Sequence, residues 1–389
     1  MKIRIIVLGG ASGDVGRDIT RILLREKTYI EKITVTARNR NIADSFTKEL
    51  GDRRIIAMQV DVNNNHQLMN ALKDHDIVIN TIGPFSRYAL LVMNAAIKSR
   101  VNYIDICDDI EPTFKGLQLD KRAKEAGVFL LIGMGWFPGM SNLRAKALAE
   151  QMDNVDEIIT AWVGGRKSPE EKPSSGVGGT EHFLRSLTGK IITFRNGRQV
   201  KIPAFQKGIQ IQFPQPLGSC YCYLMEHPEP VVLPITIPSV QNASTFFSLY
   251  PVSRNKLIRF FARMIDIKLL SVSQVIKIFR LLGNTNEKKH FPILIGSYVS
   301  CIGSKKRQKC QLSYSAVNTK TTVAEATSQP LACTVFYLIS GGIIPQGVHL
   351  PEQVLRIENI LEIGSRYNLP FIKDTIETTT WNQQIISVE

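Results

Sequence analysis

Three glycines near the start of the chain have the spacing of a phosphate-binding turn. Gly10, Gly13 and Gly16 follow the apolar run IRIIVL and lead into a run whose apolar residues recur at helical spacing. A strand, a glycine turn and a helix bring free backbone N–H groups and the positive end of the helix dipole to one point, where a pyrophosphate binds. The alternative is a plain strand-to-helix connection. The residues assigned to this dinucleotide-binding turn are Gly10, Ser12, Gly13, Asp14, Val15 and Gly16.

Basic residues follow the next strand-like segment, KITVTARNR. A dinucleotide-binding sheet contacts the adenosine ribose at this point, and a site for NAD usually has Asp or Glu there. This chain has Arg38, Asn39 and Arg40 instead. Because a guanidinium pairs well with a phosphate, the sequence predicts NADP as the cofactor. The alternative is that these arginines are solvated loop charges.

Two side chains in the segment NYIDICDD could move a proton. Tyr103 and Asp105 alternate along a predicted strand, so both lie on one face near its carboxyl end. Hydride transfer to a C–N or C–O double bond needs one proton source besides the cofactor. Both residues are therefore catalytic candidates, and a buried tyrosine with a capping carboxylate is the alternative.

Later segments hold candidates for the substrate side. Asn142, in GWFPGMSN, opens a predicted helix and is also a good N-cap residue. In GGTEHFLRSLTG, His182 is a third catalytic candidate because its usual pKa lies near neutrality, and Arg185 could bind a carboxylate. His227, in HPEP, lies either in a pocket or in an edge turn. The substrate-side candidates are Phe85, Pro138, Gly139, Asn142, Thr180, Arg185 and His227.

Alternating strand and helix patterns must position these residues. The strand-like runs RIIAMQVDV and DIVINTIGPF flank the helix-patterned NHQLMNALKDH, and LLVMNAAIKSRVNYIDICDD repeats the order. This alternation predicts an α/β domain with a doubly wound parallel sheet over residues 1–135. The loops after its third and fourth strands add Asp61, Val62, Thr81, Gly83 and Pro84 to the cofactor-binding candidates.

Composition narrows the class of protein. The chain has 389 residues, of which 44% are hydrophobic and 21% charged, so we expect a folded protein of two domains. It has no long uncharged apolar run and no leader pattern, and we expect a cytoplasmic location. The six cysteines include no CxxC pair, so we expect reduced thiols and no metal site. Motifs of serine hydrolases, NTPases and zinc proteases do not occur in the sequence.

The net charge of +14 is concentrated in one segment. Between Arg254 and Lys309, 13 Lys and Arg residues stand against two acidic residues. The first half of this segment predicts an amphipathic cationic helix, with Leu257, Phe261 and Met264 on its apolar seam. Such a helix either lies on an anionic membrane surface or packs on its own domain, and no nucleic-acid motif accompanies it. The stretch SKKRQKC predicts a solvated hairpin loop between two strands.

Several segments together resemble a known family. VLGGASGDVG, DIVINTIGPF, VNYIDICDD and GMGWFPGMSNLRAKAL are similar to the NADP-binding branch of the saccharopine dehydrogenase-like family. GVGGTEHFLRSLTGKIITFRNGRQVKIPA, FPQPLGSCYCYLMEHPEPVVLP and GVHLPEQVL resemble a subgroup of that family with no assigned substrate. The order of the segments is more specific than any one of them, and the resemblance covers nearly all of the chain outside the basic segment.

The resemblance implies an arrangement of domains and an activity. It implies a Rossmann domain at 1–135, an α/β substrate and dimerisation domain at 136–350 with the basic insert at 253–283, and C-terminal helices at 351–389 that return to the first domain. It further implies a homodimeric oxidoreductase that transfers hydride between NADP and a C–N bond of an amino-acid-like substrate. Two alternatives stay open: a trans-acting enoyl reductase for a lipid or polyketide acyl chain, and a non-catalytic NADP-binding protein at a membrane surface.

Overall fold

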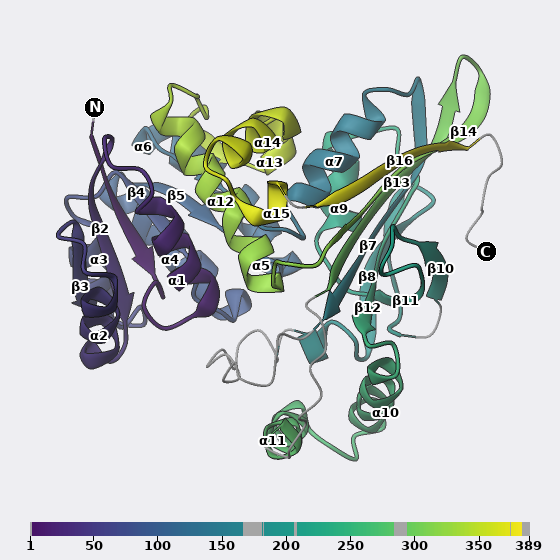
Figure 1. The fold of residues 1–389 in the computed structure, drawn as a ribbon, viewed down its shortest axis with the longest axis horizontal. Coiled ribbons are helices and arrows are strands. Elements are labelled where there is room, and N and C mark those ends of the chain that lie inside the picture. Colours follow the sequence, from purple (N-terminus) through teal and green to yellow (C-terminus); the bar gives the residue numbers. More distant parts are fainter. Residues whose placement is uncertain are drawn as a thin grey trace. The chain divides into compact units, whose positions relative to one another are not determined.

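The chain folds into two compact units, each with its own sheet and hydrophobic core. The computed structural model describes residues 2–165, 181, 183–205, 208–283, 294–373 and 375–382. Of these, unit 1 contains 2–140 and 324–369, and unit 2 contains the residues between 141 and 323 together with 370–382. Each unit is described by itself below (Figure 1).

Unit 1 is built on a parallel sheet. Among the described residues, seven strands lie in the order β15-β6-β5-β4-β1-β2-β3, and every neighbouring pair runs parallel. The order reverses between β1 and β4, which is where doubly wound sheets bind their ligands. The predicted Rossmann fold class is thereby confirmed. The strands are β1 (Ile3–Leu8), β2 (Ile30–Ala37), β3 (Ile55–Gln59), β4 (Ile77–Asn80), β5 (Asn102–Asp105), β6 (Phe129–Leu131) and β15 (Gly347–His349).

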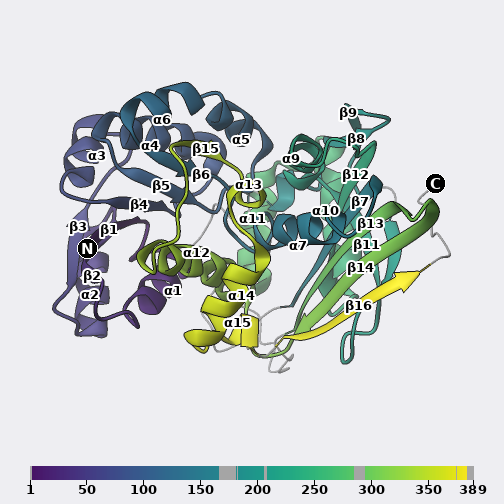
Figure 2. The same cartoon turned by 90° about the horizontal axis from the view of Figure 1, so that it is seen from above.

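Helices cover both faces of this sheet (Figure 2). The helices α3, α4, α5 and α6 lie on one face, and α1, α2 and α12 lie on the other. Apolar side chains of β1, β4, α3 and α4 form the core between the sheet and the face covered by α3 to α6. Parallel strands with helices on both faces are typically apolar along their whole length. The helices are α1 (Asp14–Leu23), α2 (Arg40–Leu50), α3 (Asn65–Leu72), α4 (Phe85–Ser99), α5 (Ile110–Leu117), α6 (Asp120–Ala126), α12 (Val323–Ile339), α13 (Pro351–Val354) and α14 (Ile357–Arg366).

Unit 2 is built on a mixed sheet. Its described strands lie in the order β10-β11-β12-β7-β13-β14-β16, with β8 and β9 attached beside β12. Only β12 and β7 run parallel among these pairs, and the others are antiparallel. The strands are β7 (Asn154–Gly165), β8 (Lys190–Arg195), β9 (Arg198–Pro203), β10 (Gly208–Gln212), β11 (Ser219–Met225), β12 (Asn242–Tyr250), β13 (Ile295–Lys305), β14 (Gln308–Asn318) and β16 (Ile376–Asn382).

Two cores hold this second sheet. One packs residues of α7 and α9 against β7, β13 and β14, and the other packs aromatic side chains such as Phe213, Phe246 and Phe247 among β10, β11 and β12. The helices assigned to this part of the chain are α7 (Met140–Ala149), α9 (Glu229–Thr236), α10 (Arg254–Asp266), α11 (Val272–Gly283) and α15 (Pro370–Lys373).

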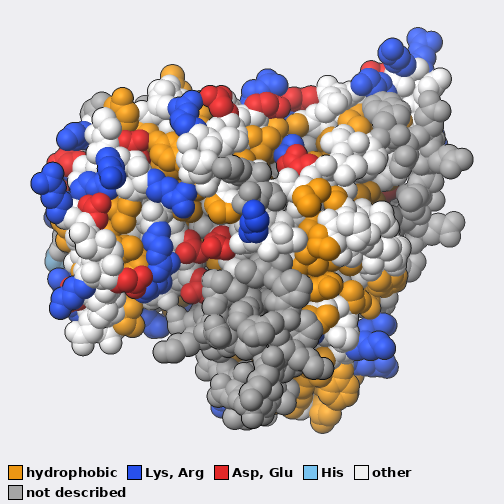
Figure 3. All heavy atoms as spheres, viewed as in Figure 1, with side chains coloured by type: hydrophobic (Ala, Val, Ile, Leu, Met, Phe, Trp, Pro, Cys, Tyr) orange, Lys and Arg blue, Asp and Glu red, His pale blue; other side chains and the backbone are white. Residues whose placement is uncertain are grey.

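The basic segment differs from the prediction in two respects. It forms two helices, α10 and α11, rather than one continuous seam. Lys268 has the left-handed φ of 61° after α10, and Ser271 and Gln274 bond reciprocally to each other's backbone N–H, which is a capping box that starts α11. Leu257 and Phe261, expected together on one apolar seam, have different environments: Leu257 is 47% exposed, while Phe261 is buried. Hydrophobic side chains gather on the surface over α10, at the lower right of Figure 3.

The predicted hairpin in the second half of the basic segment is confirmed. Strands β13 and β14 pair in antiparallel register from Ile295 opposite Asn318 to Lys305 opposite Gln308. The two residues between them, Lys306 and Arg307, both have positive φ, as a type I′ hairpin turn requires.

Candidate functional site

The glycine turn connects β1 to α1 at the switch point of the unit 1 sheet. Ser12 N–H and Gly13 N–H both donate to the Gly9 carbonyl, at 3.1 and 3.2 Å, so the chain folds tightly over the end of β1. Gly9 has a left-handed φ of 78°, which favours glycine there. Helix α1 then begins at Asp14, and no side chain of the described residues caps its N-terminus. The N–H groups of its first turn are thus left for an external acceptor.

The three glycines of the motif are required for different reasons. A Cβ on Gly10 would come within 2.8 Å of Val7, and a Cβ on Gly16 would come within 2.8 Å of the Gly9 carbonyl and of Thr81 Oγ1. Close packing of the strand and helix therefore excludes any side chain at these two positions. Among the atoms that the structure describes, a Cβ on Gly13 would meet only the Gly9 carbonyl, at 3.8 Å. Gly13 thus borders open space at the helix N-terminus. A pyrophosphate needs such a space to approach the backbone closely.

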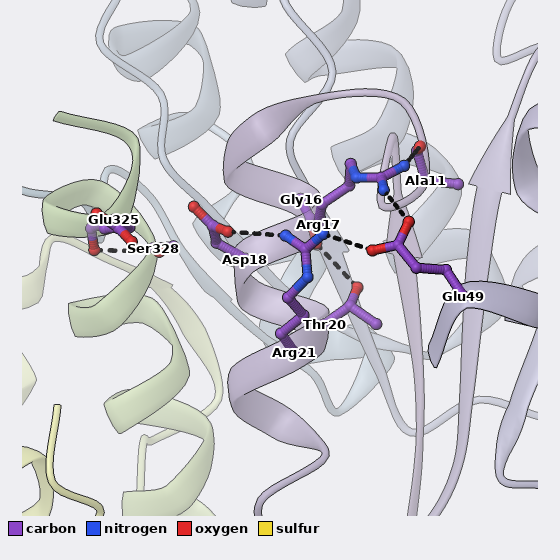
Figure 4. Close-up of polar contacts among 9 residues, drawn as sticks. All are labelled: Ala11, Gly16, Arg17, Asp18, Thr20, Arg21, Glu49, Glu325 and Ser328. Carbon is purple, nitrogen blue, oxygen red and sulfur yellow. Dashed lines mark hydrogen bonds and ion pairs between the residues drawn. The ribbon is translucent and has the colours of Figure 1, made fainter. Parts of the chain in front are cut away.

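Two arginines of α1, Arg17 and Arg21, connect the glycine turn to α2 (Figure 4). Arg17 donates to the Ala11 carbonyl at 3.2 Å and pairs with Glu49, and its guanidinium lies 4.0 Å from the centre of the Phe46 ring. Arg21 pairs with the same Glu49 at 2.8 Å. A carboxylate shared by two guanidinium groups restrains both, and hydrogen bonding to Arg21 is the largest cause that lowers the pKa of Glu49. The backbone of the glycine turn is thereby anchored to its own domain.

Three candidate residues follow β2. Asn39 and Arg40 have partners nearby in the chain, whereas the guanidinium of Arg38 has none among the described residues. Asn39 caps α2 by accepting from Asn41 N–H, and Arg40 pairs with Asp44 one turn later at 2.9 Å. Arg38 is exposed, and its guanidinium makes no hydrogen bond or ion pair with any residue that the structure describes. Arg38 is therefore available to an external anion.

The loop after β3 carries one exposed carboxylate. Asp61 accepts from the backbone N–H and the side-chain amide of Asn63, and these bonds, with the nearby Arg38 and Arg87, lower its pKa. Val62 is buried in the core of unit 1. Asp61 thus lies at the surface of the carboxyl edge, whereas Val62 packs beneath it.

The loop after β4 lies against the glycine turn. Thr81 donates through both its N–H and its hydroxyl to the Leu8 carbonyl, at 3.1 and 2.8 Å. A Cβ on Gly83 would meet nothing within 4 Å, and Pro84 precedes the first turn of α4. Phe85 is buried in the core of unit 1, so it packs α4 onto the sheet.

The two proton-transfer candidates of unit 1 form a buried network with Asn80. The Asn80 amide donates to Tyr103 OH at 3.1 Å, and Tyr103 OH donates to Asp105 at 2.6 Å. Asp105 also accepts from Gly133 N–H at 2.7 Å and Cys107 N–H at 3.0 Å. Burial is the largest cause acting on Asp105 and raises its pKa to about 6. Burial likewise raises the pKa of Tyr103 well above its usual value.

The turn that follows β6 places Pro138 and Gly139 in contact with their own loop. Gly135 N–H donates to the Pro138 carbonyl at 3.0 Å, and Met140 N–H donates to the Gly135 carbonyl at 3.0 Å. Gly139 has a φ of 116°, and a Cβ there would lie 2.3 Å from the Gly135 carbonyl oxygen. Both residues therefore shape the tight turn before α7.

Unit 2 brings another set of predicted residues into one buried cluster. His227 Nδ1 pairs with Glu229 Oε2, and Ser141 Oγ donates to Glu229 Oε1 at 2.9 Å. The Asn142 side chain accepts from Ser141 Oγ at 3.2 Å. All four side chains are nearly or fully buried. A carboxylate bonded to one ring nitrogen orients the imidazole, so the ring of His227 is held in place by Glu229.

The remaining predicted residues are distributed differently. Arg185 is exposed and pairs with Glu181 on its own helix at 2.7 Å. Thr180 and His182 lie outside the described residues. Two residues that the sequence reasoning did not single out, Arg17 and Asn80, anchor the glycine turn and the buried network. A polar residue at the end of the apolar strand IVIN was the available signal for Asn80.

Three findings bear on other classes of site. Within the described part of the chain, no group of three or more His, Cys, Asp and Glu side chains is arranged to hold a metal ion. All six cysteines are free and buried. No helix in the described ranges is both long enough and apolar enough to cross a membrane.

Comparison with known proteins finds a family model that matches the first part of the chain. Residues 5–131 match the model of the saccharopine dehydrogenase NADP binding domain. Over 195 residues the chain is 29% identical to saccharopine dehydrogenase (NADP+, L-glutamate-forming) of Schizosaccharomyces pombe, a match that covers 49% of this chain and 40% of that protein. The resemblance seen in the sequence is thereby confirmed.

Two further relatives match shorter stretches. The saccharopine dehydrogenase-like oxidoreductase of Rattus norvegicus is 25% identical over 182 residues, which is 42% of either chain. The lipid droplet localized protein of Caenorhabditis elegans is 26% identical over 141 residues, 34% of this chain and 33% of the relative. The chain thus matches less than half the length of each of these relatives.

Structural similarity extends further than sequence similarity. The apo form of saccharopine dehydrogenase (L-Glu forming) from Saccharomyces cerevisiae superposes with a TM-score of 0.69, over 97% of this chain and 100% of that one, at 14% identity. The two chains therefore share a fold over nearly their whole length.

Proposed function

We propose that this protein is an NADP-dependent oxidoreductase that transfers hydride at a C–N bond of an amino-acid-like substrate, because residues 5–131 match the model of the saccharopine dehydrogenase NADP binding domain. The observation that carries the proposal is the uncapped N-terminus of α1 beside Gly13, with the unpaired Arg38 at the same edge of the sheet. The name of the Schizosaccharomyces pombe relative supports the substrate class.

The residues of unit 1 fit the parts of NADP. Backbone N–H groups at the start of α1 bind the pyrophosphate, and the open space beside Gly13 lets it approach. Arg38 binds the 2′-phosphate, because its guanidinium is exposed and has no partner among the described residues. Gly83, which also borders open space, lies in the loop on the nicotinamide side. The bound cofactor supplies or accepts the hydride.

Tyr103 and Asp105 act as positioning residues in this proposal. Both are fully buried, and the hydrogen bonds of Asp105 tie it to Cys107 N–H after β5 and to Gly133 N–H after β6. Asn80 extends the same network to Ile82 N–H in the loop after β4, at 3.1 Å. The network therefore holds three loops at the carboxyl edge of the sheet, where the cofactor and the substrate bind.

His227 is the proposed proton source. Its ring is oriented by Glu229, which is itself held by Ser141, and an imidazole can act as a general acid or base through one ring nitrogen while a carboxylate holds the other. Asn142 is proposed to contact the substrate from the same cluster. Replacing His227 by Gln should lower kcat on the reducible substrate while leaving NADPH affinity unchanged.

The cofactor assignment is tested by titrating the purified protein with NADPH and NADH in one buffer, with Arg38→Asp and Arg53→Asp as matched variants. Arg53 is exposed and precedes β3, so it lies at the opposite, amino edge of the same sheet. We expect the wild type to prefer NADPH, Arg38→Asp to lose that preference and Arg53→Asp to keep it. Equal affinity for both cofactors in the wild type would remove the argument from Arg38, and binding of neither would leave a structural glycine turn.

The substrate class is tested with the same protein. The protein is incubated with NADPH and with imines formed from amino acids and 2-oxo acids, or with enoyl thioesters. Turnover is measured as the loss of NADPH absorbance. Turnover of the imines supports reduction at C–N, whereas turnover of the enoyl thioesters alone would replace it by an enoyl reductase activity. Tight NADPH binding without turnover on either set would favour a non-catalytic binding protein.

The proposal includes a location and an assembly. We propose a cytoplasmic protein that contacts a membrane surface through residues 254–282. The name of the Caenorhabditis elegans relative, lipid droplet localized protein, supports this location. A homodimer is proposed from the family resemblance, and light scattering of the purified chain measures it.

A further inference from the structure

Helix α10 buries one face against its own unit. Asn255 fixes the start of the helix to the end of β12, because its amide donates to Ser248 Oγ at 2.9 Å and its carbonyl oxygen accepts from Leu249 N–H at 2.9 Å. Phe261 packs with Leu184 and α11, and its ring lies 5.1 Å from that of Phe279 in an edge-to-face arrangement. The buried face of α10 is therefore fully engaged in packing.

A second apolar row remains on the outside of the same helix. Leu257, Phe260, Met264 and Ile267 are spaced at i, i+3, i+7 and i+10, so they form one stripe along the helix. The exposed fraction is 47% for Leu257, 55% for Phe260 and 60% for Ile267, and Leu269 just beyond them is 67% exposed. An exposed row of this kind on a folded protein indicates an interaction surface.

A row of cations runs beside the apolar row. Lys256, Arg259 and Arg263 each precede one member of the stripe and are exposed, and Lys268 follows its end. These four side chains make no ion pair with any of the residues described in the structure. The one acidic residue of α10, Asp266, accepts from Gly189 N–H at 2.6 Å.

We propose that this outer face of α10 docks on a phospholipid surface that carries anionic headgroups. The apolar row enters the boundary between headgroups and acyl chains, and the adjacent Lys and Arg side chains reach the phosphates. This narrows the membrane contact proposed above to one face, because Phe261 and the other residues of the buried face are not available to lipid.

The charges on α10 favour an anionic lipid surface over a second copy of the chain or a nucleic acid. A second copy docked through the same face would bring two rows of unpaired cations together, which opposes association. A nucleic acid would pair with the cations but would leave Leu257 and Ile267 without a suitable contact, since aliphatic side chains do not stack on bases as aromatic ones do. An anionic lipid surface satisfies both rows at once.

The experiment is co-sedimentation of the full chain with vesicles of phosphatidylcholine, alone or with about 30% phosphatidylserine. Two double variants are compared with the wild type: Leu257→Ser with Phe260→Ser, and Lys256→Glu with Arg259→Glu. Ile343→Ser is the matched control, because Ile343 is 75% exposed in unit 1 and has no cationic row beside it. All substituted side chains are exposed, so the fold should tolerate them, and thermal unfolding checks this.

We expect binding to the phosphatidylserine vesicles only, a loss of about tenfold or more in both double variants, and wild-type binding by Ile343→Ser. The proposal is overturned if the wild type does not sediment with these vesicles, or if both double variants bind as the wild type does. A change of oligomeric state in the Leu257→Ser, Phe260→Ser variant would show a protein interface instead. NADPH affinity, measured on the same samples, reports on the proposed enzyme separately, because no residue changed here belongs to the cofactor site.

Discussion

At the scale of single residues, Asp105 shows how burial changes a role. As the last residue of β5 it lies where a doubly wound sheet places its ligands, so the sequence predicts a catalytic group. In the structure its carboxylate is fully buried and accepts from Tyr103 OH, Cys107 N–H and Gly133 N–H. A carboxylate that already has three donors and no exposure is suited to holding loops rather than to meeting a substrate.

The raised pKa of Asp105 predicts a pH dependence of stability. Its pKa is about 6 in the folded protein, above its ordinary value, so between the two values the folded state binds more protons than the unfolded chain. The stability that this group contributes is present below about pH 4 and is lost as the pH rises through about 6. Asp105→Asn does not titrate, so relative to the wild type its free energy of unfolding should rise by about 2 kcal/mol between pH 4 and pH 7.

Urea unfolding of both proteins at several pH values measures this difference. Asp61→Asn is the control, because the pKa of Asp61 is lowered by the N–H donors of Asn63 and the sign of its effect is opposite. A difference between Asp105→Asn and the wild type that is constant with pH would contradict the burial argument.

At the scale of elements, the connection from β1 to α1 separates packing from binding. Its glycines look equivalent in the sequence, yet Gly16 is confined by Gly9 and Thr81, whereas Gly13 borders open space. The same spacing thus includes one position required by the fold and one position left for a ligand.

Two alanine substitutions test that division. Gly13→Ala should change the free energy of unfolding by less than about 1 kcal/mol, since it only places alanine at a helix N-cap. Its NADPH affinity should nevertheless fall, because the methyl group occupies the space into which the pyrophosphate approaches. Gly16→Ala should lower the stability by about 1–3 kcal/mol through overpacking. Denaturant unfolding and fluorescence titration measure the two effects, and unaltered NADPH affinity in Gly13→Ala would place the cofactor elsewhere.

At the scale of the whole molecule, two units with separate cores share one chain. The chain leaves unit 1 after residue 140 and contributes α12 to α14 to that unit later, so the proposed cofactor-binding residues and the His227 cluster belong to different units. Cofactor binding should therefore stabilise the chain unevenly.

Hydrogen exchange with and without NADPH measures this unevenness. At a cofactor concentration about 100 times Kd, exchange through openings that release the cofactor should slow by about a hundredfold. We expect this protection at residues 9–16, 38–40 and 81–83, and none at the hairpin turn of residues 305–308. NADH at the same concentration is the control and should protect less. Protection confined to unit 2 would contradict the assignment of the cofactor site.

Much of unit 1 could be predicted from the sequence because its signals are local. Strand and helix periodicities, the glycine turn and the basic residues after β2 are each contained in about ten consecutive residues, and together they indicate the Rossmann fold and NADP. The family model over residues 5–131 and the parallel sheet confirm both. The hairpin between β13 and β14 was equally local and was predicted correctly.

Tertiary structure alone decided which faces are buried and which partners each polar group has. Periodicity shows that a helix has an apolar face, but α10 has two such rows, and only packing with Leu184 and α11 determined that Phe261 is inside and Phe260 outside. The sequence placed Asp105 at a strand end, and only the fold brought Gly133, 28 residues later, to its carboxylate. Burial and long-range hydrogen bonds depend on segments far apart in the chain, so no local pattern contains them.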